Sequence, residues 1–154
     1  MADPKKVLFV CLGNICRSPL AEGIFRHLVE EAGLTNDFEI DSCGTGGWHV
    51  GSSPHRESIR IAAAHGISID SQQARQVKPS DLKHYDVIVA MDRSNQDDLL
   101  ALNPDSSVVL MRAYDDEADS PDVPDPYYGG PDGFKDVYDI LYRSAAKLLE
   151  DIRP

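Results

Sequence analysis

The segment from Val7 to Glu22 constrains the fold most, because it joins an apolar run to an amphipathic one through a short loop. Val7 to Cys11 is rich in β-branched and aromatic residues, which is typical of a strand buried on both faces. Ser18 and Pro19 then open the amphipathic segment, as an N-cap and a first helical residue would. The loop therefore leads into a helix N-terminus, where unpaired amides and the helix dipole favour an anion.

The loop carries a thiol and a guanidinium on a backbone that can curl. Gly13 and Asn14 both tolerate positive φ, so the loop amides can converge on one anion with Cys11 at the centre. A free thiol has a pKa of about 8.5, which falls beside a helix N-terminus and an arginine, so a thiolate nucleophile is predicted. Arg17 offers a planar fork of donors to two phosphate oxygens. These residues indicate attack on phosphorus; the alternative is a cysteine merely buried at a strand end.

Length and composition limit the classes of protein to which this chain can belong. The chain has 154 residues, which fits a single domain over 1–154. Its 26 acidic and 15 basic residues give a net charge of −11, which disfavours binding to nucleic acid or to an anionic membrane. The apolar run at 7–11 is too short for a signal peptide or a membrane span. With three cysteines at unequal spacing, we expect a cytoplasmic protein with reduced thiols.

Strand and helix patterns alternate along the chain. The predicted strands cover 6–10, 38–43, 86–91 and 108–110. The predicted helices run from 19 to a stop at Gly33, from 53 to a stop at Gly66, over 93–100 behind the N-cap Asp92, and over 134–152. This order predicts right-handed crossovers and a parallel sheet, with the site at the carboxyl ends of its strands. The Asp-, Pro- and Gly-rich segment 115–133 is expected to be irregular and functional.

The loop also resembles that of a known family. The low-molecular-weight protein tyrosine phosphatases have a phosphate-binding loop similar to the run Cys11-Leu12-Gly13-Asn14-Ile15-Cys16-Arg17-Ser18-Pro19. The resemblance extends over nearly the whole chain, through Trp48, Ala74-Arg75-Gln76, 91–95, 125–129 and the final helix. It implies one three-layer α/β domain, with a four-stranded parallel sheet, helices on both faces and the phosphate-binding loop after the first strand. It also implies hydrolysis of phosphotyrosine and small aryl phosphates through a phosphocysteine on Cys11, without a cofactor.

A second catalytic group is implied by the same resemblance. It is Asp125, which lies in the Asp-rich segment 115–133, called the acidic segment below. Asp125 would protonate the leaving tyrosine oxygen and then activate the water that hydrolyses the phosphocysteine. Such acid catalysis is worth about 10²–10⁴-fold. Repulsion from Asp119, Asp122 and the thiolate would keep Asp125 protonated, so we expect an acidic pH optimum with small aryl phosphates. From the residues alone, the alternative is a solvated loop with a turn-forming Asp-Pro.

The resemblance further implies a substrate cleft. Trp48, Tyr127 and Tyr128 would form walls deep enough for an aryl ring. The other residues that it implies for substrate binding are Leu12, Gly13, Asn14, Ile15, Cys16 and Ser18.

Support for the loop is expected from Ser18, which would donate a hydrogen bond to the thiolate, and from Asn14, with Glu22 as a further candidate. Many members of the family brace that asparagine with a histidine, at the position where this chain has Gln72. The bracing of Asn14 is therefore expected to differ here.

The remaining cysteines and histidines have less specific interpretations. Cys16 follows Cys11 in the curled loop, and the resemblance implies a reversible disulfide that protects the nucleophile from overoxidation. A buried spectator thiol is the alternative for Cys16, and Cys43 is expected in the core. The histidines lack paired metal-ligand spacing, so no metal is expected.

Three other functions share parts of this pattern. A thiol-dependent arsenate reductase needs two further cysteines after the third strand, and residues 80–154 contain none. A protein arginine phosphatase tends to carry threonine at the position of Ile15, and the pair Tyr127-Tyr128 favours an aryl substrate. A phosphocysteine carrier that does not hydrolyse its phosphate would have no need of Asp125. The expected partners are phosphotyrosine-containing proteins, with a tyrosine kinase among the candidates, and the expected state is a monomer or a weak dimer.

Overall fold

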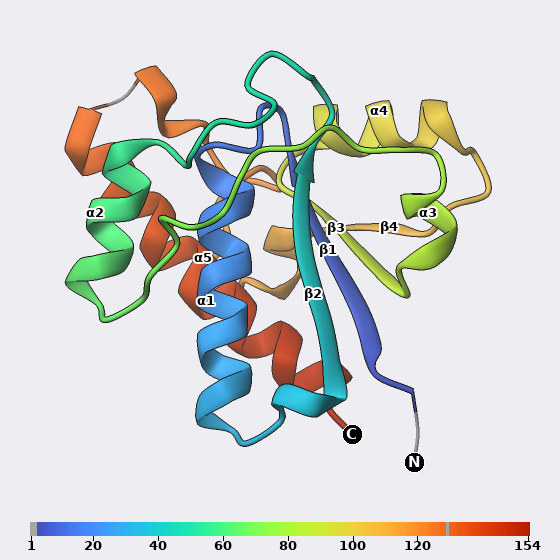
Figure 1. The fold of residues 1–154 in the computed structure, drawn as a ribbon, viewed down its shortest axis with the longest axis horizontal. Helices are drawn as coiled ribbons and strands as arrows, with labels where there is room; N and C mark the ends of the chain where they lie inside the picture. Colours follow the sequence, from blue (N-terminus) through green and yellow to red (C-terminus); the bar gives the residue numbers. More distant parts are fainter. Residues whose placement is uncertain (1–2, 129) are drawn as a thin grey trace.

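Four parallel strands form the centre of the molecule (Figure 1). The computed structural model describes residues 3–128 and 130–154, apart from the side chains at 128, 130 and 131. The strands are β1 (Lys5–Cys11), β2 (Phe38–Gly44), β3 (Val87–Ala90) and β4 (Val108–Leu110). They lie in the order β2-β1-β3-β4, and every pairing is parallel. The predicted four-stranded parallel sheet is thus confirmed.

Helices cover the sheet on both faces. The described part of the chain contains α1 (Arg17–Glu31), α2 (Arg56–Ala64), α3 (Asp81–His84), α4 (Arg93–Leu102) and α5 (Gly130–Ile152). It also contains the short 3₁₀ helices η1 (Thr35–Asp37), η2 (Met111–Tyr114) and η3 (Pro126–Tyr128). None of these helices is both long and apolar enough to cross a membrane.

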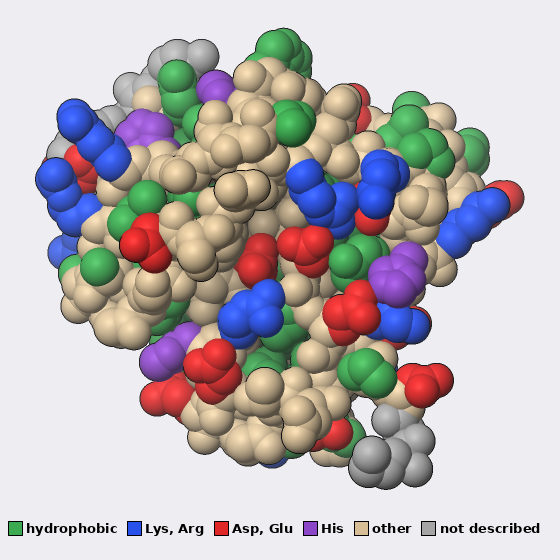
Figure 2. Space-filling view, in the orientation of Figure 1, with side chains coloured by type: hydrophobic (Ala, Val, Ile, Leu, Met, Phe, Trp, Pro, Cys, Tyr) green, Lys and Arg blue, Asp and Glu red, His purple; other side chains and the backbone are tan. Residues whose placement is uncertain are grey.

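The two sides of β1 contribute to two separate cores. Val7 and Phe9 belong to the larger core, which includes the buried faces of α1 and α5. Leu8 and Val10 belong to the smaller core, which includes Leu99 of α4. Because successive side chains of a strand point to opposite faces, an unbroken apolar run is what a central strand of a three-layer fold requires. Acidic and basic side chains lie among one another on the outer face seen in Figure 2.

Ser18 does not cap α1, contrary to the prediction. The helix begins at Arg17, and its N-cap residue, Cys16, makes no side-chain capping bond. The Ser18 hydroxyl lies instead 3.0 Å from the sulfur of Cys11. Its partner is the thiol at the end of β1 rather than an amide of its own helix.

The helix α2 begins later than the predicted start at 53. Its N-cap is His55, whose Nδ1 accepts a hydrogen bond from the amide of Glu57 at 3.1 Å. The preceding backbone is held outside the helix, because the carbonyl of Ser52 accepts a bond from the amide of Ala74 at 2.8 Å. The predicted stop at 66 is consistent with the observed end of α2.

Other element boundaries differ in smaller ways. β3 is shorter than predicted, and α4 continues to Leu102 rather than ending at 100. The segment 115–133, predicted to be irregular, includes η3 and the first turn of α5, which begins at Gly130. The helix α3 was not predicted, since its 4 residues are too few to show a helical period.

Candidate active site

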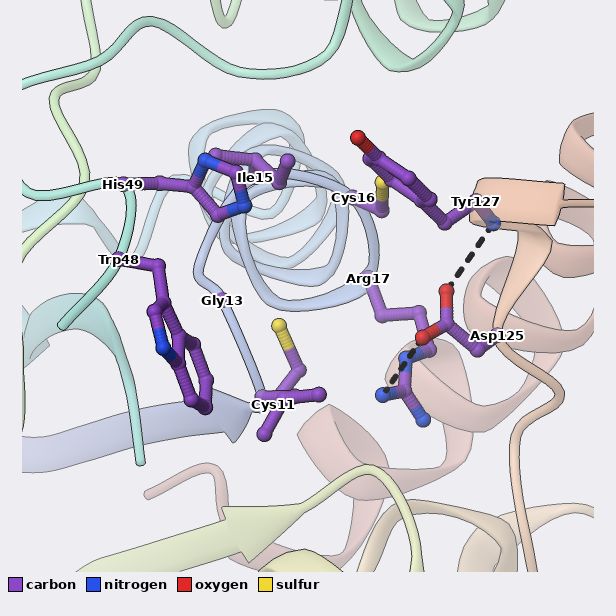
Figure 3. A pocket seen from close by; sticks show the side chains of 10 residues that line it. Cys11, Gly13, Ile15, Cys16, Arg17, Trp48, His49, Asp125 and Tyr127 are labelled. Atoms are coloured by element: carbon purple, nitrogen blue, oxygen red, sulfur yellow. Dashed lines mark hydrogen bonds and ion pairs between the residues drawn. The ribbon is translucent and has the colours of Figure 1, made fainter. Parts of the chain in front are cut away.

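A cleft of about 320 Å³ opens at the carboxyl end of β1 (Figure 3). Its walls come from the loop between β1 and α1, the loop after β2, and the segment that leads from η2 to α5. The lining residues are Cys11, Leu12, Gly13, Ile15, Cys16, Arg17, Trp48, His49, Asp125 and Tyr127. Three segments that are distant in sequence therefore meet at the edge of the sheet where the site was predicted.

One residue gives the loop between β1 and α1 its curl. Asn14 has a φ of 57°, and within the described residues it alone combines a positive φ with a side chain. Gly13 was expected to share this role, but its φ is not positive. It provides space instead, because a β-carbon there would lie 3.0 Å from Cδ2 of His49. Gly44 is needed for the same reason, since its β-carbon would lie 2.7 Å from the carbonyl oxygen of Leu12.

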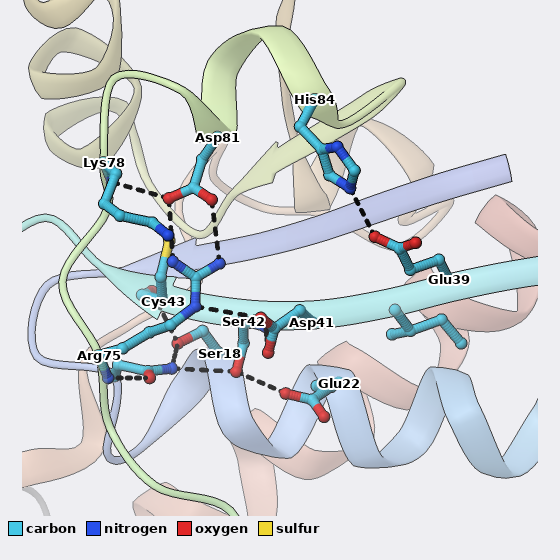
Figure 4. Close-up of polar contacts among 12 residues, drawn as sticks. Ser18, Glu22, Glu39, Asp41, Ser42, Cys43, Arg75, Lys78, Asp81 and His84 are labelled. Carbon is cyan, nitrogen blue, oxygen red and sulfur yellow. Dashed lines mark hydrogen bonds and ion pairs between the residues drawn. The ribbon is translucent and has the colours of Figure 1, made fainter. Parts of the chain in front are cut away.

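Asn14 is braced by three hydrogen bonds from both ends of its side chain, to Ser18, Ser42 and Arg75, which Figure 4 labels. Its amide nitrogen donates to the hydroxyls of Ser18 at 2.8 Å and Ser42 at 3.0 Å. Its carbonyl oxygen accepts from the backbone amide of Arg75 at 3.0 Å. Gln72 instead donates to a backbone carbonyl of α1 at 3.1 Å. The loop is thus held through Ser18, Ser42 and Arg75, and Gln72 takes no part in bracing Asn14.

Arg75 is itself fixed by two carboxylates, which makes its backbone a firm support for Asn14. Its Nε donates to Asp41 at 3.0 Å, and its Nη1 donates to Asp81 at 2.9 Å. Burial alone would raise the pKa of Asp81, but the bonds from Arg75 and the amide of Lys78 lower it below its usual value. The carboxylate therefore stays charged and keeps the guanidinium in place.

Ser18 connects this bracing to the thiol. Its hydroxyl already accepts a bond from Asn14, so its own proton is directed to the Cys11 sulfur, at 3.0 Å, or to the Cys43 carbonyl oxygen, at 3.3 Å. A thiolate is the stronger acceptor of the two and draws this proton. The geometry thus fits the expected donation from Ser18 to the thiolate.

Glu22 closes the same chain of hydrogen bonds. Glu22 is 7% exposed, and its carboxylate accepts from the Ser42 hydroxyl at 2.7 Å and from Arg26 at 3.0 Å. Burial raises the pKa of the Glu22 carboxyl, and the bonds from Ser42 and Arg26 oppose that rise. Glu22 therefore supports the loop through Ser42.

Arg17 joins the loop to two other elements. The guanidinium is 3% exposed; its Nη1 donates to Asp92 at 2.7 Å and to the Val123 carbonyl at 3.0 Å, and its Nη2 lies 3.7 Å from Asp125. Burial would lower its pKa, but the Cys11 charge and the bond to Asp92 outweigh that effect and raise it. A buried, permanently charged donor fork thus lies in the cleft beside the thiol.

Asp125 lines the cleft from the acidic segment. Its side chain is 39% exposed, with Oδ2 turned toward Arg17 and Oδ1 accepting a hydrogen bond from the amide of Tyr127 at 3.0 Å (Figure 3). The carboxyl group is accessible to a ligand in the cleft and held in one orientation by its own backbone turn.

The acidic neighbours of Asp125 are arranged differently from the expectation. Asp122 accepts bonds from the backbone and the guanidinium of Arg93, and Asp119 lies 3.1 Å from Nη1 of Arg112. The hydrogen bonds from Arg93 lower the pKa of Asp122 below its usual value. Each of these two carboxylates therefore has a cationic partner of its own, which the expectation did not include. The acidic pH optimum stays a prediction.

Aromatic side chains stand at the mouth of the cleft. Trp48 is 72% exposed and Tyr127 is 45% exposed, which places both on the rim rather than in the core. The side chain of Tyr128 lies outside the described residues. Cys16 is buried, and burial raises the pKa of its thiol to about 12. Cys43 is in the core, as expected.

Some predicted residues lie behind the cleft, and others in it were missed. Asn14 and Ser18 brace the loop and do not line the cavity. His49 lines it, and its position next to Trp48 in a glycine-rich loop was the available signal. Asp92 was predicted only as an N-cap; its Oδ1 does accept from the Asn95 amide, while its Oδ2 binds Arg17.

The acidic segment is anchored by a buried carboxylate, Asp115. Its side chain is fully buried and accepts bonds from Arg112 at 3.0 Å and from Arg143 of α5 at 2.6 and 3.1 Å. Burial would raise the pKa of Asp115, but the bonds from Arg143, the amide of Glu117 and Arg112 lower it below its usual value. The start of the segment is thereby tied to both η2 and α5.

A thiol in an anion-binding loop, with an arginine and a facing carboxyl group, defines the cysteine-dependent phosphatase class of site. Comparison with known proteins agrees with this class. Residues 6–154 match the family model "Low molecular weight phosphotyrosine protein phosphatase". A protein of that name from Schizosaccharomyces pombe is 46% identical over 151 residues, which is 96% of each chain.

Two solved structures are also similar. YfkJ from Bacillus subtilis superposes with a TM-score of 0.92 at 42% identity, covering 99% of this chain and 96% of that one. A Drosophila arginine phosphatase superposes with a TM-score of 0.89 at 33% identity, covering 97% and 98%. The chain belongs to the low molecular weight phosphotyrosine protein phosphatase family.

The buried ion pairs of Asp115 predict a pH-dependent loss of stability in Asp115→Asn. A lowered pKa means that the ionised form stabilises the fold above the ordinary pKa of about 3.9, and that this stabilisation is lost as the pH falls below it. We expect the free energy of unfolding to fall by about 3–5 kcal/mol at pH 7, and the difference from the wild type to shrink below about pH 4. Urea unfolding of the variant and of the wild type, at pH 7 and below pH 4, measures these free energies.

The matched control is Asp116→Asn. Asp116 is 82% exposed, and its ion pair with Lys147 is 3.8 Å long, so its loss should change stability by less than about 1 kcal/mol. An Asp115→Asn difference of equal size at pH 7 and below pH 4 would contradict the role given to the ionised carboxylate.

Proposed function

We propose that this chain is a protein tyrosine phosphatase, acting as one catalytic domain over 1–154, that hydrolyses phosphotyrosine and small aryl phosphates through a phosphocysteine. The observation that carries the proposal is that the Cys11 thiol, the Arg17 guanidinium and the Asp125 carboxyl group line one cleft at a helix N-terminus. A nucleophile, an anion clamp and a proton donor are the groups that phosphomonoester hydrolysis requires.

In the first step the Cys11 thiolate attacks phosphorus. A sulfur–phosphorus bond forms as the bond from phosphorus to the phenolic oxygen breaks. The loop amides and Arg17 bind the phosphoryl oxygens, and Asp125 gives its proton to the leaving oxygen. Leu12, Gly13, Ile15 and Cys16 contribute to the wall of this pocket.

In the second step water attacks the phosphocysteine. Asp125, now a carboxylate, takes a proton from the water, and the sulfur–phosphorus bond breaks to release phosphate and the thiolate. The Ser18 hydroxyl, 3.0 Å from the sulfur, stabilises the thiolate as it leaves. Asn14 keeps Ser18 and the loop amides in position throughout the cycle.

The cleft suits an aromatic substrate. Trp48 and Tyr127 line it, and Tyr128 is proposed as a third wall. We propose phosphotyrosine-containing proteins as the substrates, a tyrosine kinase being one candidate, with the enzyme in the cytoplasm as a monomer or a weak dimer.

A second candidate is a protein arginine phosphatase, because the chain is similar to the Drosophila arginine phosphatase structure. Ile15, which lines the cleft where arginine phosphatases tend to carry threonine, supports the aryl substrate instead. Two peptides of one sequence, carrying phosphotyrosine or phosphoarginine, separate the candidates through their kcat/KM.

Substitutions of the two reacting groups should have different kinetic signatures. Cys11→Ser should abolish turnover of the phosphotyrosine peptide, because no phosphocysteine can form. Asp125→Asn should lower kcat/KM by about 10²–10⁴-fold and still form the phosphocysteine, because only proton transfer is lost. Steady-state release of phosphate measures turnover, and stopped-flow detection of the freed tyrosine measures formation of the phosphocysteine.

A control is Asp132→Asn, since Asp132 is exposed in the first turn of α5 and does not line the cleft. Full activity of Cys11→Ser, or an Asp125→Asn enzyme as fast as the control, would overturn the proposed roles. A wild-type protein that accumulates phosphocysteine without turnover would instead favour a phosphocysteine carrier that does not hydrolyse its phosphate.

We also propose that Cys16 protects Cys11 from overoxidation. Peroxide converts the Cys11 thiolate to a sulfenic acid, and the Cys16 thiol then forms a disulfide with it, releasing water. Because the pKa of Cys16 is raised to about 12, this second step should be slow at neutral pH and faster as the pH rises.

Mass spectrometry after peroxide treatment tests this protection. In the wild type we expect a disulfide between Cys11 and Cys16 that dithiothreitol reverses with recovery of activity. Cys16→Ala should instead accumulate sulfonic acid on Cys11 and stay inactive. Sulfonic acid on Cys11 in the wild type, with no disulfide, would refute the protective role.

A further inference from the structure

Arg112 does not line the cleft, yet it contacts the acidic segment at three points. It lies in η2, directly after β4, and its side chain is only 4% exposed. Its Nε donates to Asp115 at 3.0 Å, and its Nη1 donates to the backbone carbonyl of Asp122 at 3.2 Å. The same Nη1 lies 3.1 Å from the carboxylate of Asp119. One guanidinium thus spans most of the chain between η2 and the cleft.

The contact at Asp122 lies next to the backbone that Arg17 holds. Arg112 binds the carbonyl of Asp122, and Arg17 binds the following carbonyl, that of Val123, at 3.0 Å. The amide of Val123 donates to the carbonyl oxygen of Met91, the residue after β3, at 2.8 Å, and the Val123 side chain is buried. Between this point and Asp125 stands only Pro124, whose ring fixes φ and leaves little freedom. The backbone at 122–123 therefore sets where the Asp125 carboxyl group lies.

The need to neutralise the Asp115 carboxylate does not by itself explain the contacts that Arg112 makes. Arg143 already gives that carboxylate two hydrogen bonds, at 2.6 and 3.1 Å. Arg112 directs only its Nε there, and turns Nη1 to the Asp122 carbonyl and to Asp119. A buried guanidinium is costly unless its donors are used, so this second set of contacts is an essential part of its site.

We propose that Arg112 is a positioning residue for proton transfer. It fixes the backbone at 122–123 against Arg17 and thereby holds Asp125 where the leaving oxygen departs. This inference rests on the proposed role of Asp125 as the general acid.

The leaving group of the substrate provides the test. Phenyl phosphate releases a weakly acidic phenol that needs a proton, whereas 2,4-dinitrophenyl phosphate releases a stable phenolate that does not. The quantity to measure is kcat/KM, because it covers the steps up to the first irreversible one, loss of the leaving group. Arg112→Met should lower kcat/KM about tenfold on phenyl phosphate and less than about twofold on the dinitrophenyl ester. A smaller folded fraction would lower both equally.

Arg143→Met is the matched control. It removes the other arginine that binds the buried Asp115 carboxylate. Among the described contacts, Arg143 makes no bond to the backbone at 122–123. It should lower stability and leave the ratio of the two kcat/KM values unchanged. An equal change of the ratio in both variants would overturn the proposal, since Asp115 and not the Asp122 carbonyl would then be the cause.

Arg112→Lys keeps the test decisive if Arg112→Met does not fold. A lysine carries the charge but cannot bind all three points of the segment with one planar fork, so the ratio should shift in the same direction by a smaller factor. An unchanged ratio in the folded variant would overturn the proposal.

Asp125→Asn separates this inference from the proposed function. It should show the same selectivity for the poor leaving group, with a larger loss. If Asp125→Asn slows both substrates equally, the general-acid role itself fails. If Asp125→Asn is selective and Arg112→Met is not, only the role of Arg112 fails.

Discussion

The two halves of the site depend on the buried guanidinium of Arg17. It is the first residue of α1, directly after the loop that carries the thiol, and it binds Asp92, the N-cap residue of α4, and the Val123 carbonyl of the acidic segment. With Asp125 at 3.7 Å, the same group also faces the proposed proton donor. Because a buried guanidinium must use its donors, the thiol loop and the acidic segment cannot separate without the loss of the hydrogen bond from Arg17 to the Val123 carbonyl. The residue proposed to clamp the phosphate thus also joins the two halves of the site.

Polar contacts rather than apolar packing hold the thiol loop. A left-handed backbone conformation at a residue other than glycine, as at Asn14, destabilises the fold by about 1–2 kcal/mol. Each of the three hydrogen bonds to the Asn14 side chain stabilises it by about 1 kcal/mol. The strain at Asn14 is therefore offset locally, through Ser18, Ser42 and Arg75. Gln72 lies outside this set, and the loop keeps its curl because Arg75, fixed by its own carboxylates, provides the third bond.

The sequence predicted those parts of the fold that local pattern determines. The apolar run of β1 and its curled loop were evident, and the parallel sheet followed from the alternation of elements. Asp125 was assigned only through the family resemblance, because an Asp-Pro in a polar loop is locally indistinguishable from a turn. The pairing of Asp122 with Arg93 could not be foreseen, since the two meet across 29 positions of sequence. For Ser18 two roles were expected, a helix cap and a hydrogen bond to the Cys11 thiolate, and the structure has the hydroxyl 3.0 Å from the sulfur and no cap bond.

The phosphocysteine is the central claim, and its direct observation is the most decisive measurement. The wild-type enzyme is mixed with a phosphotyrosine peptide, quenched in acid within milliseconds, and digested for mass spectrometry. The phosphoryl group should be on the fragment that carries Cys11, at a level that decays as inorganic phosphate appears. Phosphate found on another residue, or turnover with no labelled Cys11 at any quench time, would contradict the mechanism.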